Sequence, residues 1–512
     1  MTAAADLVVT NAEIHTLGDP DETHEAMAVR DGRVVRLGST YDVEFLAGVD
    51  TDTVDADGRV VLPGFIDAHT HLLMTGRSLV HADLSAADDA DEAVDLLCDR
   101  AAELGDDEWV LGFGYDETTW TDGRRLTRDD LDAVSETAPV VAFREDLHVA
   151  SVNGVVLDRF GDDLPPADVE TEAGDPTGVL VESAVDPIYE AIEPDADEAR
   201  ELLTAAQRHA NERGVTAVHD MVRKSKAPEV YRGLDLDGDL SVRVRLNYWA
   251  DHLDSLVDAG LRTNHGSDMV RVGGIKSYTD GSLGGHTAKL SEPYADAPDE
   301  TGQWVVSPDE VADLVARADD AGFQVTLHAI GDAAVDAALD AYAATDTPGE
   351  MRHRVEHAEL SSDDAIDRFA DLGVVASMQP NFHKWGFDGG LYDARLGDRR
   401  TDANRLPAYL DAGAPLAFGS DCMPLDPLLG VHYAVNAPSD GQSLGVTEAL
   451  RAYTAGAAYA GFDEDRLGTL EPGKRADFVA LDGSPWDRPD RIDDVDVALT
   501  AVDGDVVYDG RA

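Results

Sequence analysis

The sequence predicts an α/β protein: a distorted TIM (β/α)8 barrel with a small β-sandwich domain formed by both termini and an insertion after the first barrel strand. Three observations predict it. Apolar, β-branched runs alternate with helix-like stretches in the middle of the chain, both ends contain short strands with Asp-Gly turns, and residues 76–205 break the alternation. Near-continuous apolar strands that alternate with helices are typical of a parallel sheet, and eight such strands close a barrel.

Eight apolar runs in the middle of the chain end at polar residues. Their ranges are 60–69, 214–220, 242–249, 270–276, 323–329, 353–358, 374–380 and 415–421. Helix-like stretches cover 307–322 and 332–344, between consecutive runs. A further apolar run at 140–145, Val-Val-Ala-Phe-Arg-Glu, lies inside the insertion and could replace one of the eight, so the strand count stays open at this point.

Both chain ends alternate apolar and polar residues around Asp-Gly turns, which is typical of β-hairpins. The ranges are 6–17, 26–38 and 52–64 at one end, and 474–482 and 495–510 at the other. We expect one composite β-sandwich domain from residues 1–61 and 467–512, although two unrelated hairpins would show the same pattern. Residues 62–466 would then form the barrel, with 76–205 as an insertion that covers the site.

The charge balance is strongly acidic. The 512 residues include 103 Asp plus Glu against 40 Lys plus Arg, a formal net charge of −63, and only six of the basic residues are lysines. The acidic residues are spread along the whole chain, so they do not form an interaction tail. This surface favours a protein from a halophile, because molar salt screens the self-repulsion, although a mesophilic acidic protein has the same composition. Such a surface repels nucleic-acid phosphates.

The cysteines, the first residues and the lengths of the apolar runs indicate where the protein acts and what it binds. The two cysteines, Cys98 and Cys422, cannot form a disulfide framework. The first residues lack a secretory signal pattern, and no apolar run reaches the length of about 18 residues that a membrane helix needs. We therefore expect a cytoplasmic protein that acts on a small-molecule substrate and binds neither nucleic acid nor membrane. Whether it forms a homo-oligomer is left open.

Side chains that suit a metal site lie at the ends of the predicted strands, where barrels place catalytic groups. His69 and His71 are two residues apart on one strand, so their side chains point to the same face. Two imidazoles on one face favour a borderline metal such as zinc, although a lone histidine is more often a hydrogen-bonded or surface residue. The other strand ends carry His219, Lys276, His328, His357 and Asp421.

The order of several motifs resembles the amidohydrolase superfamily and, within it, the amidohydrolase 3 family, which includes N-substituted formamide deformylases. Residues 63–71, PGFIDAHTH, resemble the first metal motif, and residues 471–479, EPGKRADFV, resemble the terminal β-domain. The other matching segments, in order, are GFGYDETTW, VTAVHD, IKSYTDGSLGG, LHAIGDAAVD, RVEHAEL, SMQP and FGSDCMPLDP. Many relatives have Ser-Arg after DGSLG, whereas this chain has Gly285-His286, a difference that would alter substrate preference if the position contacts substrate.

This resemblance implies a metal-dependent hydrolase of carbon–nitrogen bonds other than peptide bonds. The implied metal ligands are His69, His71, Lys276, His328, His357 and Asp421. The first two histidines would hold one ion and the last two a second. Lys276 matches a lysine that is carboxylated by carbon dioxide in binuclear members and bridges both ions. The implied cofactor is a divalent metal, expected to be zinc, with two ions bridged by carboxylated Lys276; a single ion is the alternative.

In such a site a metal-bound hydroxide attacks an amide or related carbonyl. The departing amine needs a proton, and Asp421 is expected to act as general base and then as general acid. Substrate contacts are expected from His219, Asp280, Ser282, Gln379, His383, Arg144 and His148. Asp280 and Ser282 could instead shape the glycine turn. Glu356 is expected on the opposite strand face from His357, where it would pack or support a ligand from outside the site.

Two other functions fit part of the sequence. A mononuclear deaminase of the same superfamily would carry a His-x-x-Glu motif, whereas this chain has His328-Ala329-Ile330-Gly331, and it would give Lys276 no role. A catalytically inactive binding or regulatory barrel would have lost a ligand, and all expected positions are filled.

The net charge predicts salt-dependent folding. Because molar salt shortens the screening length to ~3 Å, repulsion between carboxylates should weaken and the melting temperature should rise from dilute buffer to molar potassium chloride. Thermal melts followed by circular dichroism measure this change. A melting temperature that is constant over the whole salt range would contradict the halophilic interpretation.

Overall fold

A computed structural model describes residues 4–105, 108–117, 119–121, 123–145 and 149–511. By its internal contacts the chain forms two units. The first consists of Met1–His71, Gln207–Lys224 and Tyr231–Ala512, and the second of Leu72–Ala206 and Ser225–Val230. Because the terminal strands and the barrel belong to the same unit, the predicted boundaries at 61/62 and 466/467 stay predictions.

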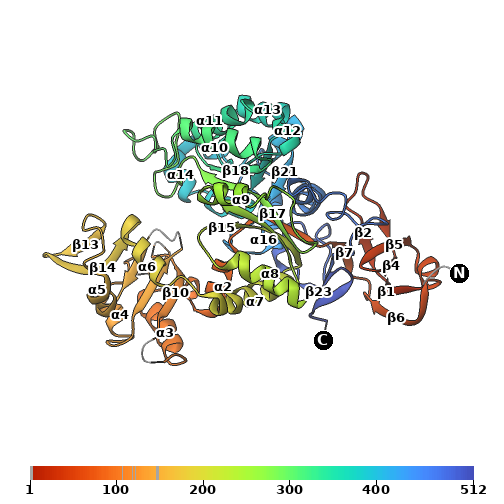
Figure 1. The fold of residues 1–512 in the computed structure, drawn as a ribbon, viewed down its shortest axis with the longest axis horizontal. Helices are drawn as coiled ribbons and strands as arrows, with labels where there is room; N and C mark the ends of the chain where they lie inside the picture. Colours follow the sequence, from red (N-terminus) through yellow and green to blue (C-terminus); the bar gives the residue numbers. More distant parts are fainter. Residues whose placement is uncertain (1–3, 106–107, 118, 122, 146–148, 512) are drawn as a thin grey trace. The chain divides into compact units, whose positions relative to one another are not determined.

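All eight predicted runs contribute a strand to one eight-stranded parallel sheet (Figure 1), in the order β21-β20-β19-β18-β17-β16-β15-β8. The strands are β8 (Phe65–Thr70), β15 (Val215–Val222), β16 (Arg243–Trp249), β17 (Val270–Tyr278), β18 (Gln324–Ala329), β19 (Arg354–His357), β20 (Val375–Met378) and β21 (Leu416–Phe418). They are almost wholly buried, as expected for a sheet covered by helices. The predicted fold class is confirmed.

Helices follow the barrel strands in sequence. They are α7 (Ala196–Glu212), α8 (Ala227–Asp237), α9 (Leu253–Asp258), α10 (Pro308–Asp320), α11 (Asp332–Ala343), α12 (Pro348–Met351), α13 (Asp363–Leu372), α14 (Leu391–Leu396), α15 (Leu406–Ala412), α16 (Pro427–Val435), α17 (Val446–Arg451) and α18 (Ala457–Ala460). Helix α10 shows why the predicted helices form where they do. Ser307 and Glu310 make a reciprocal capping box, and Pro308 occupies the first turn, where its missing N–H costs nothing.

Side-chain and backbone bonds bridge β21 and β8, the two ends of the sheet order. Asp67 Oδ1 accepts hydrogen bonds from the backbone N–H groups of His69 and Ser420, both at 3.0 Å. The N–H of Asp421 donates to the His69 carbonyl at 2.7 Å. A Cβ at Gly419 would lie 2.3 Å from the His69 nitrogen, so only glycine allows this approach. These bonds place the loop after β21 beside the end of β8.

The run 60–69 is two strands rather than one, which corrects the sequence interpretation. Val60–Pro63 form β7, which pairs with β22 of the terminal domain, whereas β8 starts at Phe65 and pairs with β15. Gly64 lies at the break, and a Cβ there would lie 2.3 Å from the Thr216 side chain. The chain therefore passes from one sheet to the other at a position where neighbouring backbone and side chains leave no room for a side chain.

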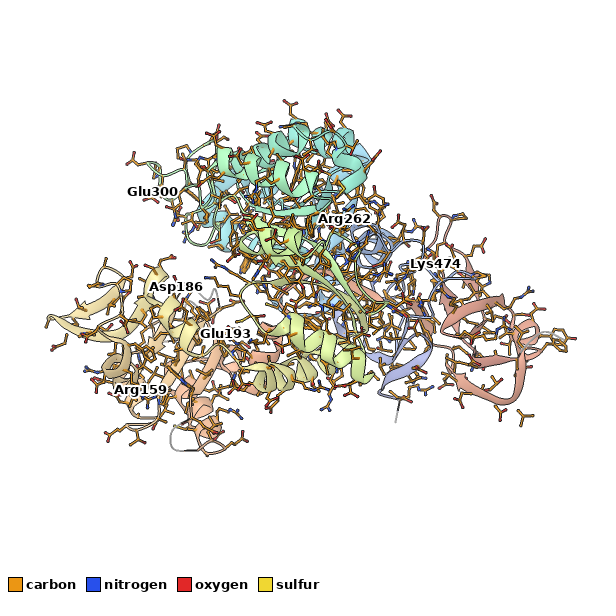
Figure 2. All side chains as sticks on the ribbon, viewed as in Figure 1. Arg159, Asp186, Glu193, Arg262, Glu300 and Lys474 are labelled. Atoms are coloured by element: carbon orange, nitrogen blue, oxygen red, sulfur yellow. The ribbon has the colours of Figure 1, made fainter. Side chains whose placement is uncertain are left out.

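The second unit contains the predicted insertion. Its six-stranded sheet has the order β13-β14-β12-β11-β10-β9. The elements are α2 (Leu72–Val80), β9 (Ala82–Asp83), α3 (Ala90–Ala101), β10 (Val110–Tyr115), α4 (Arg128–Asp132), β11 (Val140–Arg144), β12 (Val149–Val152), α5 (Gly154–Phe160), β13 (Val169–Glu172), β14 (Asp175–Val181) and α6 (Asp186–Ala191). Glu193, labelled in Figure 2, pairs with the buried Arg77 at 3.4 Å. The run 140–145 is thus β11 of this sheet and not a barrel strand.

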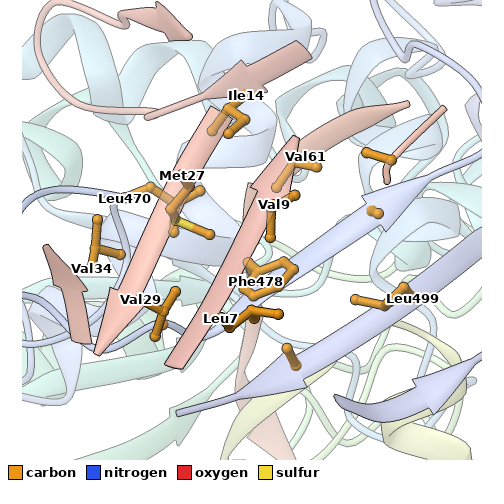
Figure 3. Packing of buried hydrophobic residues seen from close by; sticks show 14 residues of the cluster. Leu7, Val9, Ile14, Met27, Val29, Val34, Val61, Leu470, Phe478 and Leu499 are labelled. Atoms are coloured by element: carbon orange, nitrogen blue, oxygen red, sulfur yellow. The ribbon is translucent and has the colours of Figure 1, made fainter. Parts of the chain in front are cut away.

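Strands from both termini form two sheets in the first unit. The four-stranded sheet has the order β5-β4-β1-β6 and the six-stranded sheet the order β24-β23-β22-β7-β2-β3. The strands are β1 (Ala5–Thr10), β2 (Glu13–His15), β3 (Thr23–His24), β4 (Ala26–Arg30), β5 (Arg33–Gly38), β6 (Ala47–Asp55), β22 (Phe478–Leu481), β23 (Val497–Val502) and β24 (Asp505–Asp509), with α1 (Thr40–Glu44) after β5. Met27 and Val29 of one sheet share an apolar core with Phe478 and Leu499 of the other (Figure 3).

In the described part of the chain, no helix combines the length and the apolar character needed to cross a membrane.

A buried ion pair joins the barrel to the terminal strands. Arg243, at the start of β16, donates from Nε to one oxygen of Asp477 at 2.6 Å and from Nη2 to the other at 2.9 Å. Both side chains are about 95% buried, with exposed fractions of 5% and 4%. Arg243 Nη2 also lies 2.7 Å from Asp503.

Replacing Arg243 should destabilise the fold strongly. Arg243→Met leaves the Asp477 carboxylate buried without its counter-charge, a change that typically costs about 3–5 kcal/mol. Urea unfolding at fixed molar salt measures the loss. The exposed Arg262, labelled in Figure 2, is a matched control, and Arg262→Met should change stability by less than ~0.5 kcal/mol. Equal stability of the two variants would contradict this role.

Candidate metal centre

Asp421, His69 and His71 bring three donor atoms together at the carboxyl-terminal edge of the barrel sheet. Asp421 Oδ1 lies 3.5 Å from Nε2 of His69 and 3.4 Å from Nε2 of His71. One donor atom from each residue lies within 4.8 Å of the other two. Nitrogen and oxygen ligands bind zinc at ~2.0–2.2 Å, so donors roughly 3.5 Å apart can share one ion.

The other ring nitrogen of each of these histidines has a partner of its own. His69 Nδ1 lies 2.6 Å from a carboxylate oxygen of Glu356, and His71 Nδ1 lies 3.1 Å from the Met221 carbonyl oxygen. These acceptors favour the tautomer that carries the proton on Nδ1, which leaves Nε2 to act as the ligand. The arrangement is the one that metal-binding histidines commonly show.

His328 and His357 continue the row of imidazoles. The His357 ring centroid lies 4.9 Å from that of His69 and 4.5 Å from that of His328. His357 Nδ1 lies 2.7 Å from the side-chain oxygen of Gln379, and His328 Nε2 lies 3.0 Å from the Gly281 carbonyl oxygen. A metal ion bound here would therefore use Nε2 of His357 and Nδ1 of His328. The four histidines predicted as ligands thus adjoin one another.

Lys276, on β17, is buried with only 1% of its surface exposed. Burial lowers the pKa of its ammonium to about 8, against the opposing influence of the Glu356 and Asp421 carboxylates. Its charge in turn lowers the pKa values of His69 and His357, which burial already holds well below the usual value. A buried lysine could instead pair its ammonium with Asp280 or another carboxylate. Among the described residues, however, no carboxylate oxygen lies within 4.0 Å of the Lys276 ammonium.

Protonation in the centre follows from burial. Burial raises the pKa of Asp421 to about 7, and the Lys276 ammonium acts in the opposite direction. Burial lowers the pKa of His71 to about 4, with a further contribution from Lys276. His69, His71 and His357 are therefore neutral at pH 7, which is the form that binds a metal ion.

Arg354 and Glu356 support the histidines. The sequence predicted a packing or supporting role for Glu356 and no role for Arg354. The Arg354 guanidinium, 1% exposed, bonds both oxygens of Glu356 at 2.8 and 3.0 Å. It also bonds His219 Nδ1 at 2.9 Å, and its remaining acceptors are Ala68 O and Ser377 Oγ. The signal in the sequence was an arginine and an acid two residues apart on one strand, and hence on one face.

Backbone strain lies at two of the predicted ligands. His357 and Ala358 have φ values of +71° and +47°, and Asp421 and Cys422 have +53° and +54°. Residues other than glycine rarely adopt this left-handed region, and it is commonly found at functional sites. At His357 it ends the regular alternation of the strand, so His357 and its neighbour Glu356 both reach His69, although the sequence predicted opposite faces for them.

Asp280 and Ser282 shape the glycine-rich turn, the second of the two roles considered for them. The Asp280 carboxylate is fully buried and accepts hydrogen bonds from the backbone N–H groups of Lys289, Ile330 and Gly331 at 2.7, 3.0 and 2.9 Å. Ser282 Oγ accepts one from the Gly285 N–H at 3.2 Å. Asp280 also lies 3.7 Å from His328 Nε2.

Three further predicted contact residues are buried rather than open to substrate. His219 was predicted at the end of its strand, but β15 continues to Val222. Its ring is buried inside the barrel beside Arg354. Gln379, 1% exposed, holds His357. His383 is fully buried in the 3-10 helix Pro380–Trp385, with no hydrogen-bond partner for either ring nitrogen among the described residues. These positions do not favour direct substrate contact.

Arg144 and His148 are the two predicted substrate contacts in the insertion, and the structure describes only Arg144. Arg144, at the end of β11, pairs within its own unit with Asp116 at 3.1 Å and Glu117 at 2.9 Å. Its contact with substrate stays a prediction. His148 lies outside the described residues.

The donor set fits a divalent borderline metal. Two imidazoles and a carboxylate point at one place, and a buried amine and two more imidazoles adjoin them. Burial keeps His69, His71 and His357 neutral. Nitrogen and oxygen donors of this kind suit zinc and its neighbours among the transition metals. His69, His71 and Asp421 would hold one ion.

Comparisons with known proteins identify the family of this chain. The model that describes the amidohydrolase family matches residues 52–508. The protein LONG AFTER FAR-RED 3 of Arabidopsis thaliana is 32% identical over 98% of this chain and 92% of its own length. An N-substituted formamide deformylase of Arthrobacter pascens is 28% identical over 99% of each chain.

A solved structure has the same fold and a similar sequence. The crystal structure of an uncharacterised metal-dependent hydrolase from Pyrococcus furiosus superimposes with a TM-score of 0.80 at 32% identity, covering 94% of this chain and 99% of that one. A family match over most of the chain, together with this structural match, establishes the relationship. The chain belongs to the amidohydrolase family, and it is accordingly a metal-dependent hydrolase that acts on carbon–nitrogen bonds.

Proposed function

We propose that this protein hydrolyses an amide-type, non-peptide carbon–nitrogen bond of a small molecule, with Asp421 as general base and then general acid. The observation that carries the proposal is the position of Asp421 Oδ1, 3.5 and 3.4 Å from the ligand nitrogens of His69 and His71. The similarity to an N-substituted formamide deformylase supports a non-peptide amide as substrate.

The residues present fit either one metal ion or two. His69, His71 and Asp421 would hold the first, while His328 and His357 would hold the second, and Lys276 would bridge the two after carboxylation. A bound divalent ion such as zinc would lower the pKa of a water molecule to about 7 and polarise the substrate carbonyl. The lowered pKa of Lys276 supports the carboxylated form, because only the neutral amine adds carbon dioxide.

Asp421 completes the proton balance of the reaction. Water adds its oxygen to the carbonyl carbon, the carbon–nitrogen bond breaks, and the products are a carboxylic acid and an amine. Asp421 accepts the proton of the attacking water and delivers it to the leaving nitrogen, which would otherwise leave as an unstable anion. Glu356, held by Arg354, keeps His69 oriented throughout.

A panel of N-formyl, N-acyl, cyclic amide and carbamate substrates tests the proposal. Assays in molar potassium chloride with added zinc should release amine from at least one class. Folded, zinc-loaded protein that releases amine from none of them would overturn it.

Asp421→Asn should keep the fold and lose the proton acceptor. Turnover of the best substrate in the panel should fall by at least ~10²-fold, while the histidines retain metal. Steady-state kinetics and elemental analysis measure the two effects. Asp313→Asn, on the exposed face of α10, is the control and should leave both unchanged. Near-normal turnover of the Asp421 variant would show that the proton travels through another residue.

Lys276→Ala should remain folded but should hold less metal, with the content falling from about two equivalents towards one. A short carboxylic acid should restore part of the activity, because it can replace the missing bridge. Inductively coupled plasma analysis counts the metal. Lys474→Ala, in the terminal domain, should retain the full content (Figure 2). Two tightly bound equivalents in the Lys276 variant would rule out the bridge.

A further inference from the structure

A row of aromatic rings leads from the metal centre to an exposed arginine. The Tyr278 ring centroid lies 4.9 Å from that of His328 and 5.2 Å from that of Trp249. The Arg223 guanidinium carbon then lies 5.6 Å from the Trp249 ring centroid. On neighbouring barrel strands Trp249 pairs in register with Lys276, and Tyr278 pairs in register with His328. Each of the two aromatic residues therefore lies beside a predicted ligand.

The guanidinium of Arg223 has no carboxylate partner among the described residues, and its side chain is exposed directly after β15. This is notable in a chain with 103 acidic against 40 basic residues. Elsewhere in the first unit arginines such as Arg243 and Arg354 bind carboxylates.

We propose that Arg223 binds a carboxylate of the substrate, and that the preferred substrates are amides whose amine or acyl part carries an anionic group beyond a flat apolar segment. This inference rests on the proposed hydrolysis. A guanidinium binds a carboxylate through two parallel hydrogen bonds, and Trp249 and Tyr278 offer ring faces and edges to an apolar spacer. The acidic surface of the chain repels anions, so a cation at this place selects an anionic substrate by direct contact rather than by long-range attraction.

Matched substrates isolate the charge. N-formylbenzylamine is neutral, whereas N-formyl-4-(aminomethyl)benzoate and its 3-isomer carry a carboxylate at two distances from the scissile bond. In molar potassium chloride, where screening acts over ~3 Å, only a direct contact should discriminate between them. Hydrogen bonds to charged groups are worth roughly 10- to 100-fold, so kcat/KM for one of the carboxylates should exceed that of the neutral compound by about that factor.

Variants assign the preference to Arg223. Arg223→Gln should raise KM for the carboxylate substrate about 10-fold or more, with kcat and the neutral substrate little changed. Arg223→Lys should retain part of the preference, because it keeps the charge without the planar fork. Arg262→Gln removes an equally exposed charge that follows α9, before the start of β17, and should have no effect. A preference unchanged in Arg223→Gln would overturn the inference.

A binding measurement separates this inference from the proposed reaction. Calorimetry on zinc-loaded protein compares the amines benzylamine and 4-(aminomethyl)benzoate without turnover. If no formamide is hydrolysed but the benzoate binds more tightly through Arg223, the proposed reaction fails for this class and the anion site stands. Hydrolysis without a carboxylate preference leaves the reaction intact and removes the inference. Equal affinity for both amines, or no binding of either, also removes it.

Discussion

The buried guanidinium of Arg354 connects several strands inside the barrel by hydrogen bonds. Arg354 neutralises Glu356, and the same side chain bonds His219, the Ala68 carbonyl and Ser377, so it joins four barrel strands at one level. Glu356 in turn fixes the ring of His69. A carboxylate in this position would be costly without its counter-charge, because burial penalises an unpaired ion by several kcal/mol. The orientation of the His69 ring therefore depends on the buried ion pair between Glu356 and Arg354.

The same hydrogen bonds close the barrel between β8 and β21 and place Asp421 in the site. Asp67 and the carbonyl of His69 bond the loop after β21, and this contact carries Asp421 to the histidines. The left-handed backbone at Asp421 and His357 turns both side chains out of regular strand geometry. Such strain persists only where the surrounding structure fixes it, and here the Asp67 bonds and the Gln379 bond to His357 supply that constraint.

The same edge of the barrel carries both cation-binding groups and a group that can bind an anion. The histidines and Asp421 present donors for a cation, whereas Trp249 and Tyr278 present apolar rings that end at a guanidinium. These groups come from β8, β16, β17, β18, β19 and the ends of β15 and β21, which are distant in sequence. A parallel barrel brings the ends of all its strands to one edge, so one fold can combine a reaction centre with a separate element of substrate recognition.

The sequence by itself located the eight runs that become barrel strands, the strand-rich ends, and the histidines, Lys276 and Asp421 that adjoin one another, because apolar periodicity and strand-end positions are local properties. It left the strand count open, because the run 140–145 has the same pattern, and it left open whether the two ends form one domain. Only the tertiary structure decided the rest. The break at Gly64 depends on the approach of Thr216, and the burial of His219 depends on the length of β15. That His357 and Glu356 both face the site depends on the strained φ of His357. The role of Arg354 depends on partners from other strands. These are contacts between segments far apart in the chain, and no local pattern encodes them.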